Sequence, residues 1–139
     1  MTRGLIHHIE LYVSNVERST RFWGWLLESL GYEQYQQWTQ GCSWKLENTY
    51  IVFVQVEERF LQIPYHRSRV GMNHLAFHAE SRAHVDELTK ALQEKGVSIL
   101  YKERHPFAGG PHHYAVYFEG PDRIKVELVA PGEEVSCFQ

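Results

Sequence analysis

Three side chains that can bind a transition metal occur in strand-like segments of this sequence. His8 and His74 each open an alternating apolar segment, and Glu127 lies in a third such segment near the carboxyl end. Two neutral imidazoles and one carboxylate can hold a divalent ion and leave positions open for water or substrate. Taken singly, each histidine also fits a hydrogen-bonded structural role, and Glu127 fits a surface ion pair with Lys125. Together they predict a metal site, to which Gln55 could add a weaker oxygen ligand.

The elements that must position these side chains are repeated along the chain. The segments "LIHHIELYVSNVERSTRFWGWLLESLGY" and "GMNHLAFHAESRAHVDELTKALQEKGVSI" share one order of strand, polar cap, helix and glycine. Ser14 or Asn15 is expected to cap the first helix and Ser81 the second, with Gly31 and Gly96 ending them. Superposing the two histidines offsets the halves by 74 − 8 = 66 residues.

Each helix is followed by three further strand-like runs, so each half reads β-α-β-β-β. These runs are "YEQYQQW", "CSWKLEN" and "YIVFVQVE", then "VSILYKE", "HHYAVYFEG" and "IKVELVAP". The pattern predicts an α+β fold, in which two βαβββ modules form a cupped, mostly antiparallel sheet with helices outside. We expect one domain over residues 1–139, with module one at 5–57, a linker at 58–70, module two at 71–131 and a tail at 132–139.

Alternation within the strands predicts which side chains face the inside of this cup. The apolar side of a strand should pack on its helix, and the intervening residues then point the other way. This rule places His8, His74 and Glu127 on the inner face. In the fourth strand it assigns the valines to the helix, so that Phe53 and Gln55 face inward.

Composition excludes several classes of function. A net charge of −3 and dispersed basic residues give no footprint for nucleic acid or anionic membranes. Cys42 and Cys137 have neither CxxC spacing nor the number expected of a disulfide framework. No apolar run is long enough to span a membrane, and the first strand begins too early for a signal peptide. We therefore expect a cytoplasmic protein that acts on a small molecule.

Three segments resemble the vicinal oxygen chelate superfamily, which includes glyoxalase I, extradiol dioxygenases, and fosfomycin- and bleomycin-resistance proteins. They are "IHHIELYVSNVERSTRFW", "MNHLAFHAES" and "YFEGPDRIKVELVAP", and the similarity extends from Leu5 to Pro131. The resemblance implies metal ligands at His8, His74 and Glu127. Glyoxalase I enzymes usually add a fourth-strand glutamate, where this chain has Gln55. The final turn departs as well, because Arg123 replaces the common glycine and is expected to adopt positive φ.

The resemblance implies a metal-dependent lyase or isomerase acting on a small carbonyl or thiol adduct through an enediolate. Glu127 would then be both ligand and catalytic proton shuttle, with Zn, Ni, Co, Mn or Fe(II) as the metal. Two alternatives remain open: an Fe(II) extradiol dioxygenase and a non-catalytic sequestering protein of the bleomycin-resistance type. A thiol transferase of the fosfomycin-resistance type also shares the ligand set. Family members commonly form homodimers, some of which complete the site across the interface.

Other side chains are weaker candidates for a role in the site. Val116 and Phe118 are expected to face the helix, which turns His113 and Tyr117 inward. Tyr117 also occupies a position where the dioxygenases often carry an active-site tyrosine. The remaining candidates are two histidines that could act as acids or bases and three linker arginines that could clamp a substrate carboxylate: His105, His112, Arg59, Arg67 and Arg69.

Overall fold

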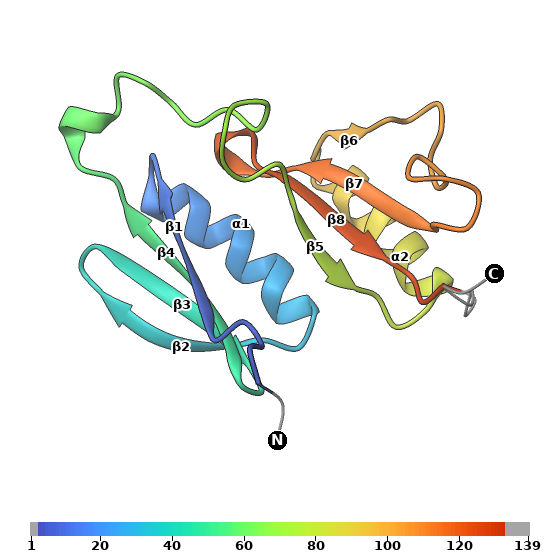
Figure 1. Ribbon diagram of the computed structural model, residues 1–139, viewed down its shortest axis with the longest axis horizontal. Helices are drawn as coiled ribbons and strands as arrows, with labels where there is room; N and C mark the ends of the chain where they lie inside the picture. The colour runs from blue at the N-terminus through green and yellow to red at the C-terminus, as the bar shows by residue number, and fades with distance from the viewer. Residues whose placement is uncertain (1–2, 133–139) are drawn as a thin grey trace. The chain divides into compact units, whose positions relative to one another are not determined.

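The structure is a computed structural model that describes residues 3–132, and it divides into two compact units, Met1–Tyr65 and His66–Gln139. Most of the expected tail lies outside the described residues. Each unit has the order β-α-β-β-β (Figure 1). The first contains β1 (His8–Val13), α1 (Val16–Ser29), β2 (Glu33–Trp38), β3 (Gly41–Leu46), β4 (Thr49–Gln55) and the 3₁₀ turn η1 (Glu58–Phe60). The second contains β5 (Leu75–His78), α2 (Arg82–Glu94), β6 (Ile99–Leu100), β7 (Ala115–Glu119), η2 (Pro121–Arg123) and β8 (Lys125–Val129).

The predicted α+β class and the repeated βαβββ plan are confirmed. The first unit forms a four-stranded sheet in the order β1-β4-β3-β2, and the second forms one in the order β5-β8-β7-β6. In each sheet the module's first strand pairs in parallel with its last strand, while the other pairs are antiparallel. The connection from the first strand to the last runs through the helix and two further strands, which is long enough for a parallel pair. The repeat therefore extends to strand order and direction.

Both helices begin and end with the expected local chemistry. The side chain of Asn15 accepts a hydrogen bond from the Arg18 backbone N–H at 3.0 Å, and Ser81 Oγ accepts one from His84 N at 3.1 Å. Gly31 has φ 98° and Gly96 has φ 75°, the left-handed conformation that commonly follows a helix. Within residues 3–132, neither helix has the length and apolar content that a membrane crossing requires.

The core of the first unit lies between α1 and one face of its sheet. Trp23 is completely buried and stacks on Phe53 with ring centroids 5.0 Å apart. The register pairs Leu11 with Phe53 and Val13 with Gln55, so these four residues share the helix-facing side. The prediction that Phe53 and Gln55 face away from the helix was wrong.

The reason for this error is that β4 is buried on both sides. Val52 is 2% exposed and its neighbour Phe53 is 0% exposed, so an apolar side chain does not distinguish one face from the other. His8 pairs with Tyr50 in the register and its ring stacks on the Tyr50 ring at 4.7 Å. The predicted direction of His8, opposite to the helix-facing side, holds within this unit.

The second unit repeats this arrangement around α2, which covers one face of its sheet (Figure 1). Four completely buried side chains of β7 and β8 belong to the unit's core: Val116, Phe118, Val126 and Leu128. Glu127 alternates with two of these and pairs in the register with Ala76 on one side and Tyr117 on the other. The face opposite to the core therefore carries Glu127 and Tyr117, as alternation predicts.

Candidate functional site

Glu127 is a carboxylate buried in the middle of the second sheet, and only 3% of the residue is exposed. Its Oε1 lies 3.0 Å from Nε2 of His74, just before β5, and its Oε2 contacts Nε2 of His113, just before β7. Both imidazoles are partly open to solvent. A buried carboxylate must be paired, and here two imidazoles occupy its two oxygens. We refer to His74, His113 and Glu127 as the Glu127 cluster.

Asn73 bears on the protonation of this cluster. Nδ1 of His74 lies 2.8 Å from Oδ1 of Asn73, which can only accept a hydrogen bond. An Nδ1 proton donated to Asn73 leaves a lone pair on Nε2, the form in which histidine binds metals. Nε2 of His74 and Oε1 of Glu127 would then face each other as two acceptors. Such a contact is favourable only with a shared proton or a cation between the two atoms.

Tyr117 lies against the same carboxylate. Burial and the neighbouring Glu127, through its charge and a hydrogen bond, raise the pKa of Tyr117 to about 12. The Tyr117 ring also lies near both imidazoles, 6.0 Å from that of His74 and 6.5 Å from that of His113. Tyr117 is therefore a neutral hydrogen-bond donor at physiological pH.

Gly109 allows His113 and Tyr117 to approach the site. A Cβ atom at residue 109 would overlap the His113 ring and would lie 2.8 Å from the Tyr117 hydroxyl. Neither contact is compatible with the observed side-chain positions. A larger residue at this point would have to displace the His113 or Tyr117 side chain.

The predicted site residues fall into two groups. His74 and Glu127 are in contact, whereas His8 belongs to the other unit, where Nδ1 of His7 lies 2.9 Å from its own Nδ1. Gln55 is committed elsewhere: its Oε1 accepts from Val16 N and its Nε2 donates to the Ser14 carbonyl, both at 2.9 Å. The carboxamide thus caps α1, which argues against the suggestion of a fourth ligand.

The remaining candidates have separate roles. Arg59 pairs with Glu57 at 2.8 Å, and Arg67 pairs with Glu119 at 2.7 Å, so both guanidinium groups already hold carboxylates of this chain. Of the loop histidines, His113 joins the cluster and His112 is exposed. Alternation before β7 indicated the direction of His113. Nothing in the sequence indicated Asn73 or Gly109, because their roles depend on contacts made after folding.

The donor types of the Glu127 cluster fit a divalent transition metal, since two imidazoles and a carboxylate form a familiar ligand set. The distances between the imidazole nitrogens and the carboxylate oxygens are those of direct contacts, with one imidazole on each oxygen. Among residues 3–132, no three histidine, cysteine, aspartate or glutamate side chains already converge as a metal-holding group. Coordination would require the imidazoles to turn toward a common point. The donor types therefore suit a divalent metal, and in this structure each carboxylate oxygen of Glu127 contacts one histidine.

A hollow lies in the first unit, between the start of α1 and the turn joining β2 and β3. Its volume is about 370 Å³, and its lining includes Glu17, Thr20, Arg21, Trp38 and Cys42. Burial raises the pKa of the Cys42 thiol, while a 3.3 Å contact with the Thr20 hydroxyl opposes that shift. A protonated, buried thiol is a poor nucleophile, so we assign this hollow no chemistry.

Comparison with known proteins identifies the family of this chain. Residues 7–118 match the family described as the Glyoxalase/Bleomycin resistance protein/Dioxygenase superfamily. The chain belongs to this superfamily. The uncharacterized protein YqjT of Bacillus subtilis (strain 168) is 63% identical over 126 residues, which are 91% of this chain and 98% of that protein.

Two solved structures show the same fold. A crystal structure of a candidate glyoxalase from Bacillus halodurans has 60% identity and a TM-score of 0.92, covering 93% of this chain and 97% of that one. Lactoylglutathione lyase from Agrobacterium tumefaciens has 20% identity and a TM-score of 0.65, covering 94% of this chain and 96% of that one. At 20% identity the second likeness establishes only that the superfamily fold is shared.

Proposed function

We propose that this protein is a metal-dependent, glyoxalase-like lyase or isomerase acting on a small carbonyl or thiol-adduct substrate. The observation that supports it most is the buried Glu127 carboxylate, whose two oxygens meet imidazole nitrogens of His74 and His113. Burying a carboxylate beside two imidazoles carries a desolvation penalty that an apolar core would avoid. The same arrangement is suited to cation binding and proton transfer. Superfamily membership supports the same reaction class.

The proposed ligands are His74 and Glu127, with a second imidazole. His8 is the residue that the superfamily resemblance implies for this role, and His113 is the donor already in contact with Glu127. Asn73 supports His74 as a ligand because its oxygen can hold the Nδ1 proton and leave Nε2 available. A bound divalent ion would act as a Lewis acid, stabilising negative charge on a substrate oxygen.

The side chains of the cluster can move a proton between neighbouring substrate atoms. Glu127 accepts the proton as a base, and the His113 contact with its Oε2 offers the next position for that proton. Tyr117 remains protonated and can donate a hydrogen bond to the carboxylate or to a substrate oxygen. The burial of Glu127 keeps competing water away from the base.

Metal titration of purified protein tests the ligand set. We expect the wild-type protein to bind Zn(II), Ni(II) or Co(II), and His74→Ala and Glu127→Gln to weaken that affinity by on the order of a hundredfold. His78→Ala, at the end of β5, and His112→Ala, beside His113, serve as matched exposed controls. Comparing His8→Ala with His113→Ala identifies the second imidazole. Unchanged affinity in His74→Ala and Glu127→Gln would refute the metal site.

Parallel activity assays separate the lyase from its main alternative. The position of Tyr117 beside Glu127 also suits an extradiol dioxygenase, because such enzymes often carry a tyrosine near the metal. Protein loaded anaerobically with metal should isomerise a hemithioacetal without consuming oxygen. Oxygen uptake with a catechol would favour the dioxygenase, and tight ligand binding without turnover would favour sequestration.

We further propose that the protein acts as a cytoplasmic homodimer. The segment between the two modules displays large apolar side chains to solvent, including Phe60 at 56%, Ile63 at 79% and Val70 at 109% relative exposure. Apolar side chains gathered in one exposed segment favour association with another protein surface. Sedimentation or light scattering should give a mass of twice 16.4 kDa. A monomer at micromolar concentration would contradict the dimer.

A further inference from the structure

Lys125 lies on the same strand as Glu127 and faces the same side of the sheet. The two residues are two positions apart along β8, which corresponds to about 7 Å between Cα atoms. The register pairs Glu127 with Tyr117 and Lys125 with Glu119, so these four side chains form two adjacent rows on one face. A ligand held at Glu127 therefore lies within reach of the Lys125 side chain.

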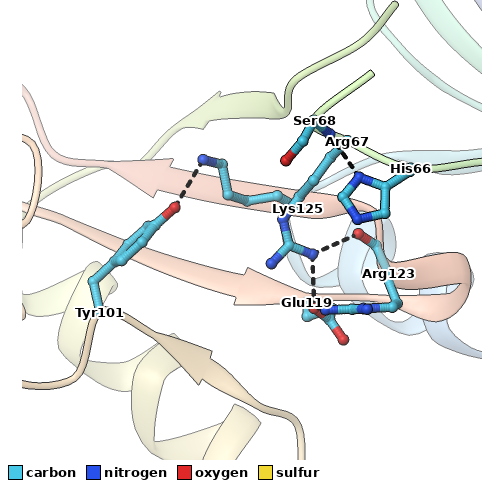
Figure 2. Close-up of polar contacts among 7 residues, drawn as sticks. All are labelled: His66, Arg67, Ser68, Tyr101, Glu119, Arg123 and Lys125. Carbon is cyan, nitrogen blue, oxygen red and sulfur yellow. Dashed lines mark hydrogen bonds and ion pairs between the residues drawn. The ribbon is translucent and has the colours of Figure 1, made fainter.

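The cross-strand partner of Lys125 is already occupied. Glu119 Oε2 is 2.7 Å from Nη1 of Arg67 and 3.5 Å from Nε of Arg123, and Arg67 also donates to the Arg123 carbonyl at 2.9 Å (Figure 2). The Arg67–Glu119 pair is partly buried, which strengthens it. Arg123 holds this position with φ 59°, the strained conformation expected from the sequence. Two arginines thus neutralise the carboxylate that pairs with Lys125 across the strands.

Lys125 turns instead toward a neutral group. Its Nζ donates to the Tyr101 hydroxyl at 3.0 Å, and Figure 2 shows the side chain extended toward Tyr101 and away from Glu119. Nζ also lies 5.3 Å from the Tyr101 ring centroid and 5.8 Å from that of Tyr117. Among residues 3–132, no carboxylate forms an ion pair with Lys125. The ammonium group contacts two aromatic rings and one hydroxyl, and its charge remains available to an anion.

Tyr101 is itself held under strain. Its φ is 57°, although it is not a glycine, and its carbonyl accepts hydrogen bonds from Arg104 N and His105 N, both at 3.0 Å. The Arg104 guanidinium lies 5.1 Å from the same ring and adds a second positive charge. A left-handed φ at a non-glycine residue costs free energy, and such residues cluster at functional sites. The strain at Tyr101, which positions a cation beside the candidate site, is therefore a sign of function.

We propose that Lys125, positioned by Tyr101, binds a carboxylate on the distal part of the substrate, several bonds from the oxygens held at Glu127. This inference rests on the proposed function for the position of the reacting end, and it names the substrate class as an organic acid with a second anionic group. Lys125 contributes charge and one or two hydrogen bonds, while the Tyr101 hydroxyl, which accepts from Nζ, can donate its own proton to the same carboxylate. The ordering of both groups before binding reduces the entropy lost in recognition.

Two probes that differ only in the distal carboxylate test this subsite. 2-Oxoglutarate carries the distal carboxylate, and 2-oxovalerate has the same chain without it. Binding of each is measured by calorimetry to zinc-loaded and metal-free protein, for wild type, Lys125→Met, Lys125→Arg and the exposed-helix control Lys90→Met. Circular dichroism and a zinc titration of each variant verify that fold and metal affinity are retained.

We expect wild type to bind 2-oxoglutarate about tenfold more tightly than 2-oxovalerate, as one charge-assisted contact provides. Lys125→Met should bind both acids equally, while Lys125→Arg and Lys90→Met should keep most of the preference. A preference that persists in Lys125→Met, or is absent in wild type, overturns the proposal. Failure of the protein to bind zinc would refute the proposed metal centre alone, because the same comparison in metal-free protein still tests Lys125.

Discussion

Gln55, at the end of β4, hydrogen-bonds across to Val16, the first residue of α1. Its Oε1 accepts from the Val16 N–H and its Nε2 donates to the Ser14 carbonyl, both at 2.9 Å. The first N–H groups of a helix have no partner within the helix, so this side chain satisfies one of them from a neighbouring strand. One glutamine therefore fixes the angle at which α1 leaves β1.

The first prediction is that Gln55→Ala lowers the free energy of unfolding by about 1–2 kcal/mol, the usual loss when a helix cap is removed. Gln55→Glu keeps the acceptor and loses the donor to Ser14, so its effect should be smaller. Urea unfolding measures both. The exposed helical residue Gln93 provides the control, since Gln93→Ala should change stability by less than about 0.5 kcal/mol. Equal midpoints for Gln55→Ala and Gln93→Ala would contradict the capping role.

The sequence predicted the strand and helix order well because each module combines clear alternation with clear helix caps. It failed on the direction of Gln55 for a physical reason. Both faces of β4 are apolar and buried, so alternation contains no information about which face meets the helix. Packing of Trp23 on Phe53 decides the direction, and that contact joins residues 30 positions apart.

The candidate site shows the same limit. The positions of His74 and Glu127 followed from alternation in strands with one polar face, and their contact agrees with that reasoning. The relation of Lys125 to Tyr101 could not be predicted, because it depends on a left-handed φ at Tyr101. Sequence patterns report burial and periodicity, whereas such strained turns depend on the contacts that surround them.

A second prediction concerns the buried hydroxyl of Ser19 in α1. Ser19 is 0% exposed, and its Oγ has no hydrogen-bond partner among the described residues. Burial without a partner is unfavourable, and alanine is also the better helix former, so Ser19→Ala should raise the free energy of unfolding by about 1 kcal/mol.

Ser29 is the matched control within the same helix. Its Oγ donates to the Leu26 carbonyl at 2.6 Å, so Ser29→Ala gains helix propensity but loses a hydrogen bond. Thermal unfolding of both variants should show a rise in Tm for Ser19→Ala and little change for Ser29→Ala. A fall in Tm for Ser19→Ala would indicate that this hydroxyl is hydrogen-bonded in solution.

A third prediction follows from the raised pKa of Cys42. Burial favours the neutral thiol, so its reaction with a disulfide reagent should need a pH above the ordinary thiol value of 9.0, and should be slow in the folded protein. The measurement uses Cys137→Ser, in which Cys42 is the remaining cysteine. Unfolding in urea should restore the rate of an ordinary thiol.

Thr20 provides the internal test of that prediction. Its hydroxyl contacts Cys42 Sγ at 3.3 Å and lowers the thiol pKa against the larger effect of burial. Removing the hydroxyl in Thr20→Val should move the pH dependence further upward. Rapid modification of Cys42 in the folded protein at neutral pH would show that the thiol is more accessible than its 3% exposure indicates.

The last prediction concerns Gly109, which lies against two side chains of the candidate site. A methyl group there would overlap the His113 ring and approach the Tyr117 hydroxyl to 2.8 Å. Because side chains shift more easily than backbone, Gly109→Ala should displace His113 from Glu127 while lowering stability only modestly. If His113 supplies the second imidazole, metal affinity should fall by more than about tenfold, as it does when groups that orient ligands are lost.

Gly132→Ala is the matched control, since its added carbon would meet its nearest neighbour, the His112 carbonyl oxygen, at an ordinary 3.8 Å. Loss of metal affinity in His113→Ala with full affinity in Gly109→Ala would mean that the loop yields in place of the ring; unchanged affinity in both would assign the second imidazole to His8.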